Sequence, residues 1–219
     1  MDIPGTASLD YWEAKQKLFH ELRREFGGSN AIDAMECVPR ELFVPDAYRH
    51  LAYEDRALPI GDGQTISQPS IVAIMTRLLE LKPSDKVLDV GTGSGYQAAI
   101  LSLLVEKVIS VERLPHISDI AKQRLSSLGY SNVQVAVARD VLGSPTDAPF
   151  DGIIVAAGAR EIPLQLKCQM AEGGRMVIPV GQDMDKRLLK VLNSDGRFSV
   201  SSHGFCRFVP LLGVQSQEL

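Results

Sequence analysis

The stretch Val87-Leu88-Asp89-Val90-Gly91-Thr92-Gly93-Ser94-Gly95 decides the fold of this 219-residue chain. A predicted strand, 86–90, leads directly into a glycine-rich turn, and a helical pattern follows the turn. A strand, glycine turn and helix in this order are typical of the ligand-binding edge of a doubly wound α/β sheet, because glycine lets the backbone approach a ligand closely. The sequence therefore predicts a small-molecule site at this turn.

The spacing of the glycines narrows the choice of ligand. A dinucleotide loop reads G-x-G-x-x-G, but Tyr96 stands where the last glycine would be. The loop here reads G-x-G-x-G, the form typical of S-adenosylmethionine sites. The next predicted strand ends at Glu112, 21 residues after Gly91 (112 − 91), and an acidic residue there can accept hydrogen bonds from both ribose hydroxyls. A nicotinamide cofactor and S-adenosylmethionine both remain compatible with these two features.

Outward from the loop, short apolar runs alternate with helical patterns. The expected strands are 86–90, 107–111, 133–137, 152–155, 175–180 and 187–192. The expected helices are 11–26, 31–37, 70–81, one after Gly95, 117–128 and one around 163–170. This alternation predicts a parallel sheet covered on both faces. We expect one domain, 1–219, in which a helical and looped extension, 1–70, precedes the core, 71–219.

Composition argues against a nucleic-acid or membrane protein. The chain has 23 basic and 27 acidic residues, a net charge of −4, whereas nucleic-acid binding favours clustered positive charge. No apolar stretch approaches the roughly 20 residues of a membrane helix, and residues 1–10 do not resemble a secretory signal. The three cysteines and four histidines lack disulfide or metal-site spacing. We expect a cytoplasmic protein without a metal.

Five segments resemble protein-L-isoaspartate O-methyltransferases, in the order of that family. They are VPRELFVP at 38–45, ALPIGDGQTISQP at 57–69, VLDVGTGSGYQA at 87–98, VIPVG at 177–181 and RFVPLLG at 207–213. The resemblance implies a class I methyltransferase with a mostly parallel seven-stranded sheet. It also implies transfer of a methyl group from S-adenosylmethionine to the free carboxylate of L-isoaspartyl residues in damaged proteins, and a monomer.

The same resemblance assigns the expected site residues. Ser67 is the residue most closely tied to catalysis. The other expected substrate residues are Thr65, Ile66, Gln68, Val180, Val209, Pro210 and Leu211. The expected cofactor residues are Asp89, Gly91, Thr92, Gly93, Ser94, Glu112, Arg113 and Asp140.

The implied reaction requires placement more than acid–base chemistry. A carboxylate with a reference pKa of about 4 is ionised at neutral pH, so no strong general base is needed. The Ser67 hydroxyl could bind one carboxylate oxygen while the other attacks, or Ser67 or Gln68 could instead cap the helix that starts near Pro69. Asp89 could orient the glycine loop or merely cap it, and Asp55 could order the substrate segment through Arg56 or a backbone N–H.

The sequence departs from the family pattern after the third predicted strand of the core. Arg139 stands where the family's aspartate would contact the adenine amino group, and arginine cannot accept a hydrogen bond. We expect Asp140 to make that contact, while Ser144 replaces a tryptophan. Besides the repair enzyme, two alternatives therefore stay open. One is a carboxyl methyltransferase for a dedicated peptide or other carboxylate, and the other is a non-catalytic S-adenosylmethionine-binding module.

Overall fold

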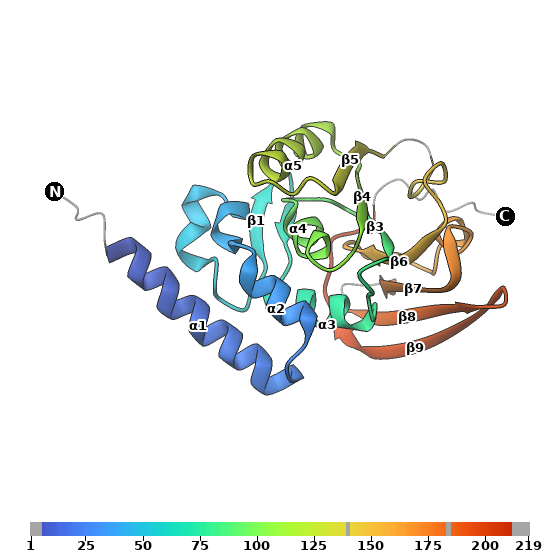
Figure 1. Ribbon diagram of the computed structural model, residues 1–219, viewed down its shortest axis with the longest axis horizontal. Coiled ribbons are helices and arrows are strands. Elements are labelled where there is room, and N and C mark those ends of the chain that lie inside the picture. Colours follow the sequence, from blue (N-terminus) through green and yellow to red (C-terminus); the bar gives the residue numbers. More distant parts are fainter. Residues whose placement is uncertain (1–5, 139–140, 183–184, 212–219) are drawn as a thin grey trace.

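The strand before the glycine loop, β3 (Lys86–Val90), lies inside a seven-stranded sheet. The computed structural model describes residues 6–138, 141–182 and 185–211. The sheet order is β5-β4-β3-β6-β7-β8-β9 (Figure 1). The strands β3, β4, β5, β6 and β7 are parallel, whereas β8 pairs antiparallel with β7 and β9 pairs antiparallel with β8 at one edge. The other strands are β4 (Lys107–Glu112), β5 (Val133–Val137), β6 (Phe150–Val155), β7 (Met170–Val180), β8 (Lys186–Ser194) and β9 (Arg197–Cys206). The expected mostly parallel seven-stranded sheet is confirmed.

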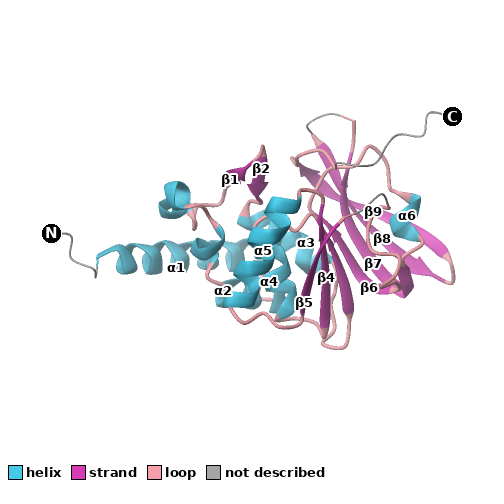
Figure 2. Ribbon diagram, turned by 90° about the horizontal axis from the view of Figure 1, so that it is seen from above, coloured by secondary structure: helices cyan, strands magenta, loops and turns pink. Residues whose placement is uncertain are grey.

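Each face of the sheet has its own apolar core, because side chains alternate along a strand. Val87 belongs to the core under α3 (Pro69–Leu78) and α4 (Tyr96–Ser102), and α5 (Pro115–Ser127) covers the same face (Figure 2). The next residue, Leu88, belongs to the core on the opposite face, where the short helix α6 (Leu164–Lys167) and the loops around β6 pack. Strands buried on both faces explain the nearly continuous apolar runs.

The N-terminal segment packs beside the helical face. It comprises α1 (Thr6–Phe26), α2 (Asn30–Cys37), the 3-10 helices η1 (Arg40–Phe43) and η2 (Asp46–Leu51), and the hairpin β1 (Leu58–Gly61) and β2 (Gln64–Ile66). Helix α1 buries Leu18, Phe19 and Leu22, while its N-terminal end extends away from the body (Figure 1). The segment thereby brings β2 to the carboxyl ends of the core strands.

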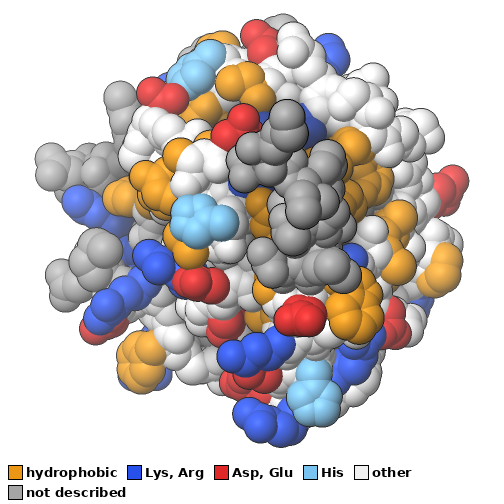
Figure 3. All heavy atoms as spheres, turned by 90° about the vertical axis from the view of Figure 1, so that its left-hand side faces the viewer, with side chains coloured by type: hydrophobic (Ala, Val, Ile, Leu, Met, Phe, Trp, Pro, Cys, Tyr) orange, Lys and Arg blue, Asp and Glu red, His pale blue; other side chains and the backbone are white. Residues whose placement is uncertain are grey.

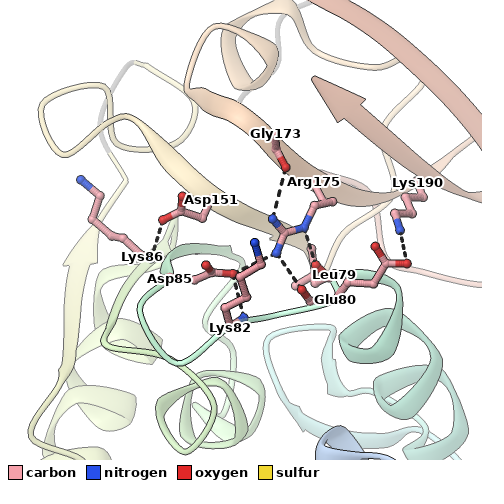
Figure 4. Close-up of polar contacts among 9 residues, drawn as sticks. All are labelled: Leu79, Glu80, Lys82, Asp85, Lys86, Asp151, Gly173, Arg175 and Lys190. Carbon is pink, nitrogen blue, oxygen red and sulfur yellow. Dashed lines mark hydrogen bonds and ion pairs between the residues drawn. The ribbon is translucent and has the colours of Figure 1, made fainter. Parts of the chain in front are cut away.

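Helix α3 ends at Leu78 rather than at the expected residue 81. A buried polar contact that the sequence did not indicate lies just beyond this end. Arg175, which is 8% exposed, donates to the carbonyls of Leu79 and Glu80 and pairs with Asp85 at 2.9 Å (Figure 4). These bonds satisfy two carbonyls that have no intrahelical partner after the helix ends, and Glu80 takes a left-handed φ of 49°.

Three other local expectations differ from the structure. The helix expected around 163–170 is only four residues long, because Met170 already starts β7. Strand β9 was not expected, since its residues are mostly exposed and polar. The β1–β2 hairpin lies in the extension 1–70, for which the sequence predicts only helices and loops. In the part of the chain that is described, no helix is both long and apolar enough to cross a bilayer.

Candidate active site

A cavity opens at the carboxyl ends of β3, β4 and β6, where doubly wound sheets bind ligands. It measures about 1000 Å³ including the part that is open to solvent. The glycine loop forms its floor, β2 and the adjoining Ser67 form one wall, and residues 208–211 form another. Three regions far apart in the sequence therefore meet at one site.

The glycine loop begins with two backbone hydrogen bonds across the sheet. The N–H groups of Gly91 and Thr92 donate to the carbonyl of Val111 at 2.8 and 3.3 Å. Gly91 has a φ of +96°, and a Cβ there would lie 3.6 Å from the Cβ of Ala156. Because L side chains rarely adopt this φ, glycine leaves the loop backbone exposed to the cavity without strain.

Glu112 is oriented by the backbone around it. Its Oε2 accepts the Gly93 N–H at 2.9 Å, and its Oε1 accepts the N–H groups of Arg113 and Leu114 at 2.8 and 3.1 Å. The side chain is largely buried but lines the cavity. A carboxylate offers about four acceptor positions, so at least one remains for a ribose hydroxyl.

Asp89 lies behind the loop and does not line the cavity. Its Oδ2 accepts the Ser110 hydroxyl at 2.7 Å, and the Ser110 oxygen lies 2.6 Å from the Thr92 hydroxyl. Asp89 is thus connected to the loop through Ser110. This arrangement favours a role in which Asp89 orients the loop rather than contacting the cofactor directly. The pKa of Asp89 is raised to about 7, mainly by burial; the hydrogen bond from Ser110 acts in the opposite direction, and the charge of Glu112 adds to the rise.

Ser67 stands at the cavity wall with a half-buried side chain. The residue that caps α3 by position is Gln68, and its side chain makes no capping bond. Asp55 performs this role instead, accepting the Ser70 N–H at 2.8 Å and the Gln68 amide at 2.9 Å. The structure thus does not bear out the alternative that Ser67 or Gln68 caps the helix, and of the two routes considered for Asp55 it shows the one through a backbone N–H.

The third wall is the C-terminal segment, which pairs with the loop after β6. Gly158 donates its N–H to the Val209 carbonyl at 2.8 Å and accepts the Leu211 N–H at 2.9 Å. The adjacent residue, Ala159, forms a bridge with Val180. This short ladder positions Val209, Pro210 and Leu211 along the cavity.

Most of the expected site residues meet at the cavity. The lining includes Thr65, Ile66, Ser67, Gly91, Thr92, Gly93, Ser94, Glu112, Arg113, Val209, Pro210 and Leu211. Gln68, Val180 and Asp89 lie outside its lining, and Asp140 lies outside the described residues. Sequence reasoning missed lining residues from several elements, namely Gln64, Val72, Met75, Val90, Tyr96, Gln97, Val111, Ala138, Leu142, Gly143, Ile154, Ala156, Ala157 and Phe208. Most are apolar or small and carry no motif of their own.

One edge of the cavity depends on a buried amide that the sequence did not single out. Gln169 accepts the Ser144 N–H at 2.8 Å and donates to the Leu142 and Gln165 carbonyls at 2.8 and 2.9 Å. Gly143, between the two bonded residues, has a φ of +82°, and a Cβ there would lie 2.5 Å from Gln169 Oε1. Gln169 therefore fixes the cavity-lining segment at 142–143.

A sequence model of the family described as protein-L-isoaspartate(D-aspartate) O-methyltransferase matches residues 13–216. The chain belongs to this family. A protein-L-isoaspartate O-methyltransferase of Methanoculleus marisnigri is 48% identical over 190 residues, which cover 87% of this chain and 86% of the relative. Protein-L-isoaspartate O-methyltransferase 2 of Marinobacter nauticus is 50% identical over 194 residues, with coverages of 88% and 89%.

The fold of this protein-L-isoaspartate(D-aspartate) O-methyltransferase family member also matches a solved structure. A Plasmodium falciparum protein described as a protein-L-isoaspartate O-methyltransferase, in complex with S-adenosyl-L-homocysteine, has a TM-score of 0.78 and 25% identity. The match covers 90% of this chain and 97% of that chain. In this family member, the open backbone at Gly91 and the remaining acceptor capacity of Glu112 fit a ribose-bearing cofactor.

Proposed function

We propose that this protein is a protein-L-isoaspartate O-methyltransferase that uses S-adenosylmethionine to methylate the free carboxylate of L-isoaspartyl residues in damaged proteins. The family membership and the relatives' similarity over most of their length support this activity. The observation that carries it in the structure is the Ser67 hydroxyl, which lies on the same cavity as the glycine loop. Among the described residues, this hydroxyl has no hydrogen-bond partner.

The substrate carboxylate is ionised at neutral pH, so the protein need not remove a proton from it. The bound cofactor supplies an activated methyl group. Ser67 acts as a neutral donor to one carboxylate oxygen and leaves the other oxygen nucleophilic. An arginine or lysine in its place would pair more strongly with both oxygens and blunt their attack. Ile66, which is buried, and the apolar residues 208–211 help to exclude water from the reacting atoms.

The cofactor residues divide by role in this proposal. The loop Gly91-Thr92-Gly93-Ser94 presents backbone to the cofactor, Glu112 binds the ribose, and Arg113 lies beside it at the cavity. Asp89 acts from behind the loop through Ser110. On the substrate side, Thr65 and residues 209–211 contact the peptide, while Gln68 and Val180 support these walls from outside the cavity.

The adenine contact remains a prediction at Asp140. If this carboxylate accepts a hydrogen bond from the adenine amino group, Asp140→Ala should weaken S-adenosylmethionine binding by more than ~1 kcal/mol, the usual effect of losing a bond to a charged acceptor. Calorimetric titration measures the affinity. The paired variant Arg139→Ala should leave it unchanged. An unchanged affinity in Asp140→Ala would exclude the contact.

The whole chain acts as one domain in this proposal, with 1–70 as the substrate-side extension of a core at 71–219. Asp55 bonds Gln68 and Ser70 at the start of helix α3, which continues from the extension into the core and so supports a single domain. We also propose a monomer in the cytoplasm. Its three cysteines are free, which suits a reducing compartment. Acidic and basic side chains are interspersed on the face in Figure 3, as expected for protein rather than nucleic-acid substrates.

The test uses methyl-labelled S-adenosylmethionine and two peptides that differ only in L-isoaspartate or L-aspartate at one position. We expect base-labile label in the isoaspartyl peptide and background in its partner. If neither peptide is labelled, cofactor titration separates the alternatives. Tight binding would then indicate a different carboxylate substrate, and absent binding would indicate a protein that has lost the activity.

A further inference from the structure

A buried arginine joins the two halves of the active site. Arg40, in η1, has no exposed surface. Its Nε donates to the Ala52 carbonyl and its Nη2 to the Ser67 carbonyl, both at 2.8 Å. Its guanidinium lies over the Tyr96 ring, with Cζ 4.8 Å from the ring centroid. Tyr96 opens α4 directly after the glycine loop and lines the cavity.

The charge of this arginine is not balanced by an ion pair. Among the described residues, no carboxylate lies within ion-pair distance of Arg40. Burial lowers its pKa, yet a guanidinium stays protonated at neutral pH. A buried charge is costly unless it is paired and hydrogen-bonded, and hydrophobic side chains of similar volume would fill this position at less cost. Fold stability alone therefore does not account for an arginine here.

The directions of its bonds suggest what the arginine provides. A guanidinium is planar and rigid, so two bonds and a stacked ring fix its position and the groups that it contacts. The Ser67 carbonyl is thereby fixed relative to Tyr96, and so relative to the helix that follows the cofactor loop. Asp55 in turn bonds Gln68 and Ser70, which follow Ser67 in the chain. The carbonyl of the residue that carries the donor hydroxyl, and the residues after it, are consequently fixed by hydrogen bonds.

We propose that Arg40 is a positioning residue for methyl transfer: it sets Ser67 at the distance from the cofactor loop that the reacting carboxylate requires. This role rests on the proposed function. It does not require contact between Arg40 and the substrate, because Arg40 acts through the Ser67 backbone. Placement errors of about 1 Å can lower rates by about 100-fold, so a loss of this bond should appear mainly in kcat.

The matched control is Arg175, a second buried arginine, which donates to three backbone carbonyls and also pairs with Asp85. It lies in β7 and bonds Leu79, Glu80 and Asp85 (Figure 4). This segment precedes β3, whereas the glycine loop follows β3. Arg40→Met and Arg175→Met both remove a buried guanidinium. Arg40→Lys keeps the charge but offers a compact ammonium in place of the planar fork, and it serves as the second variant if Arg40→Met does not fold.

The measurements are kcat and KM for an isoaspartyl peptide, the dissociation constant for S-adenosylmethionine and the melting temperature, all on the full chain. We expect Arg40→Met to lower kcat by at least about tenfold, with cofactor affinity within about threefold of the unaltered protein. Arg40→Lys should also lower kcat, because it loses the two-carbonyl geometry. Arg175→Met should lower the melting temperature and leave kcat within about twofold at a temperature where it is folded.

Two results would overturn this role. One is a kcat for both Arg40 variants within about twofold of the unaltered protein. The other is a fall of kcat that is accompanied by an equal fall of cofactor affinity, or that Arg175→Met reproduces. Either pattern would mean that Arg40 supports the fold in general rather than the position of Ser67. Absence of methylation by the unaltered protein is a separate result, which would overturn the proposed function and this role with it.

Discussion

Replacing Asp89 by asparagine should change how stability depends on pH. The carboxyl is fully buried, and only one of its oxygens has a hydrogen-bond partner in the described structure. Burial raises its pKa from the ordinary 3.8 to about 7. At about 1.36 kcal/mol per pH unit, this rise corresponds to roughly 4 kcal/mol. Asparagine has nearly the same shape and does not titrate.

The direction in which stability changes with pH follows from the number of protons that the folded and unfolded states bind. Between about pH 4 and pH 7 the unfolded chain has lost the proton of Asp89 while the folded protein retains it. The folded state therefore binds more protons, and stability falls as pH rises through this window. The contribution is fully present below pH 4 and is lost as pH passes about 7. The asparagine variant lacks this loss.

The assay is urea unfolding of both proteins without cofactor, followed by circular dichroism between pH 4 and pH 8. The difference between their unfolding free energies cancels the other titrating groups. As pH rises from about 4 to about 7, this difference in unfolding free energy should shift by up to roughly 4 kcal/mol in favour of the variant. Above about pH 7 the difference should stay constant. A difference that is independent of pH would refute the reasoning, because it would mean that Asp89 is ionised throughout.

Three further changes test the cavity itself. Ser67→Ala should lower kcat by about 10- to 100-fold through loss of the donor, with cofactor affinity by calorimetry nearly unchanged; an equal loss of both would contradict a substrate role. Glu112→Gln should weaken S-adenosylmethionine binding by about tenfold or more, since an amide is a poorer acceptor for the N–H groups and ribose hydroxyl, and unchanged affinity would exclude the ribose contact. Gly143→Ala should destabilise the protein by about 1–3 kcal/mol, because the new Cβ would clash with Gln169 and because the positive φ strains an alanine. A melting temperature equal to that of the unaltered protein would show instead that Gln169 can move aside.

Sequence periodicity predicted most of the core, because the central strands β3, β4 and β6 are buried on both faces, and the edge strand β5 keeps an apolar run although it is only partly buried. Lys86–Val90 and Val133–Val137 match their expected bounds. Strand β9 escaped prediction because its long exposed edge has no apolar alternation to mark a buried face. The end of α3 escaped for another reason. The carbonyls of Leu79 and Glu80, just beyond that end, are bonded by Arg175, nearly 100 residues away in sequence, and no local pattern encodes such a contact.

In the candidate site, too, residues with a local sequence signal could be predicted, and residues that depend on distant contacts could not. The glycine loop and Glu112 could be found because backbone conformation and strand ends leave local sequence signals. Arg40 and Gln169 could not be found in this way, because each donates to backbone carbonyls that come close to it only when the chain folds. A buried arginine or glutamine looks the same in sequence as an exposed one. What the VPRELFVP segment at 38–45 contributes to the site becomes visible only in three dimensions.

The three backbone N–H groups around Glu112 have a consequence for the speed of cofactor capture. The carboxylate already has its orientation before any ligand arrives. Association then needs no preceding rearrangement of the loop, so the observed rate should rise linearly with cofactor concentration in a single phase. Differences in affinity among variants of this loop would consequently arise in how long the cofactor stays rather than in how fast it enters.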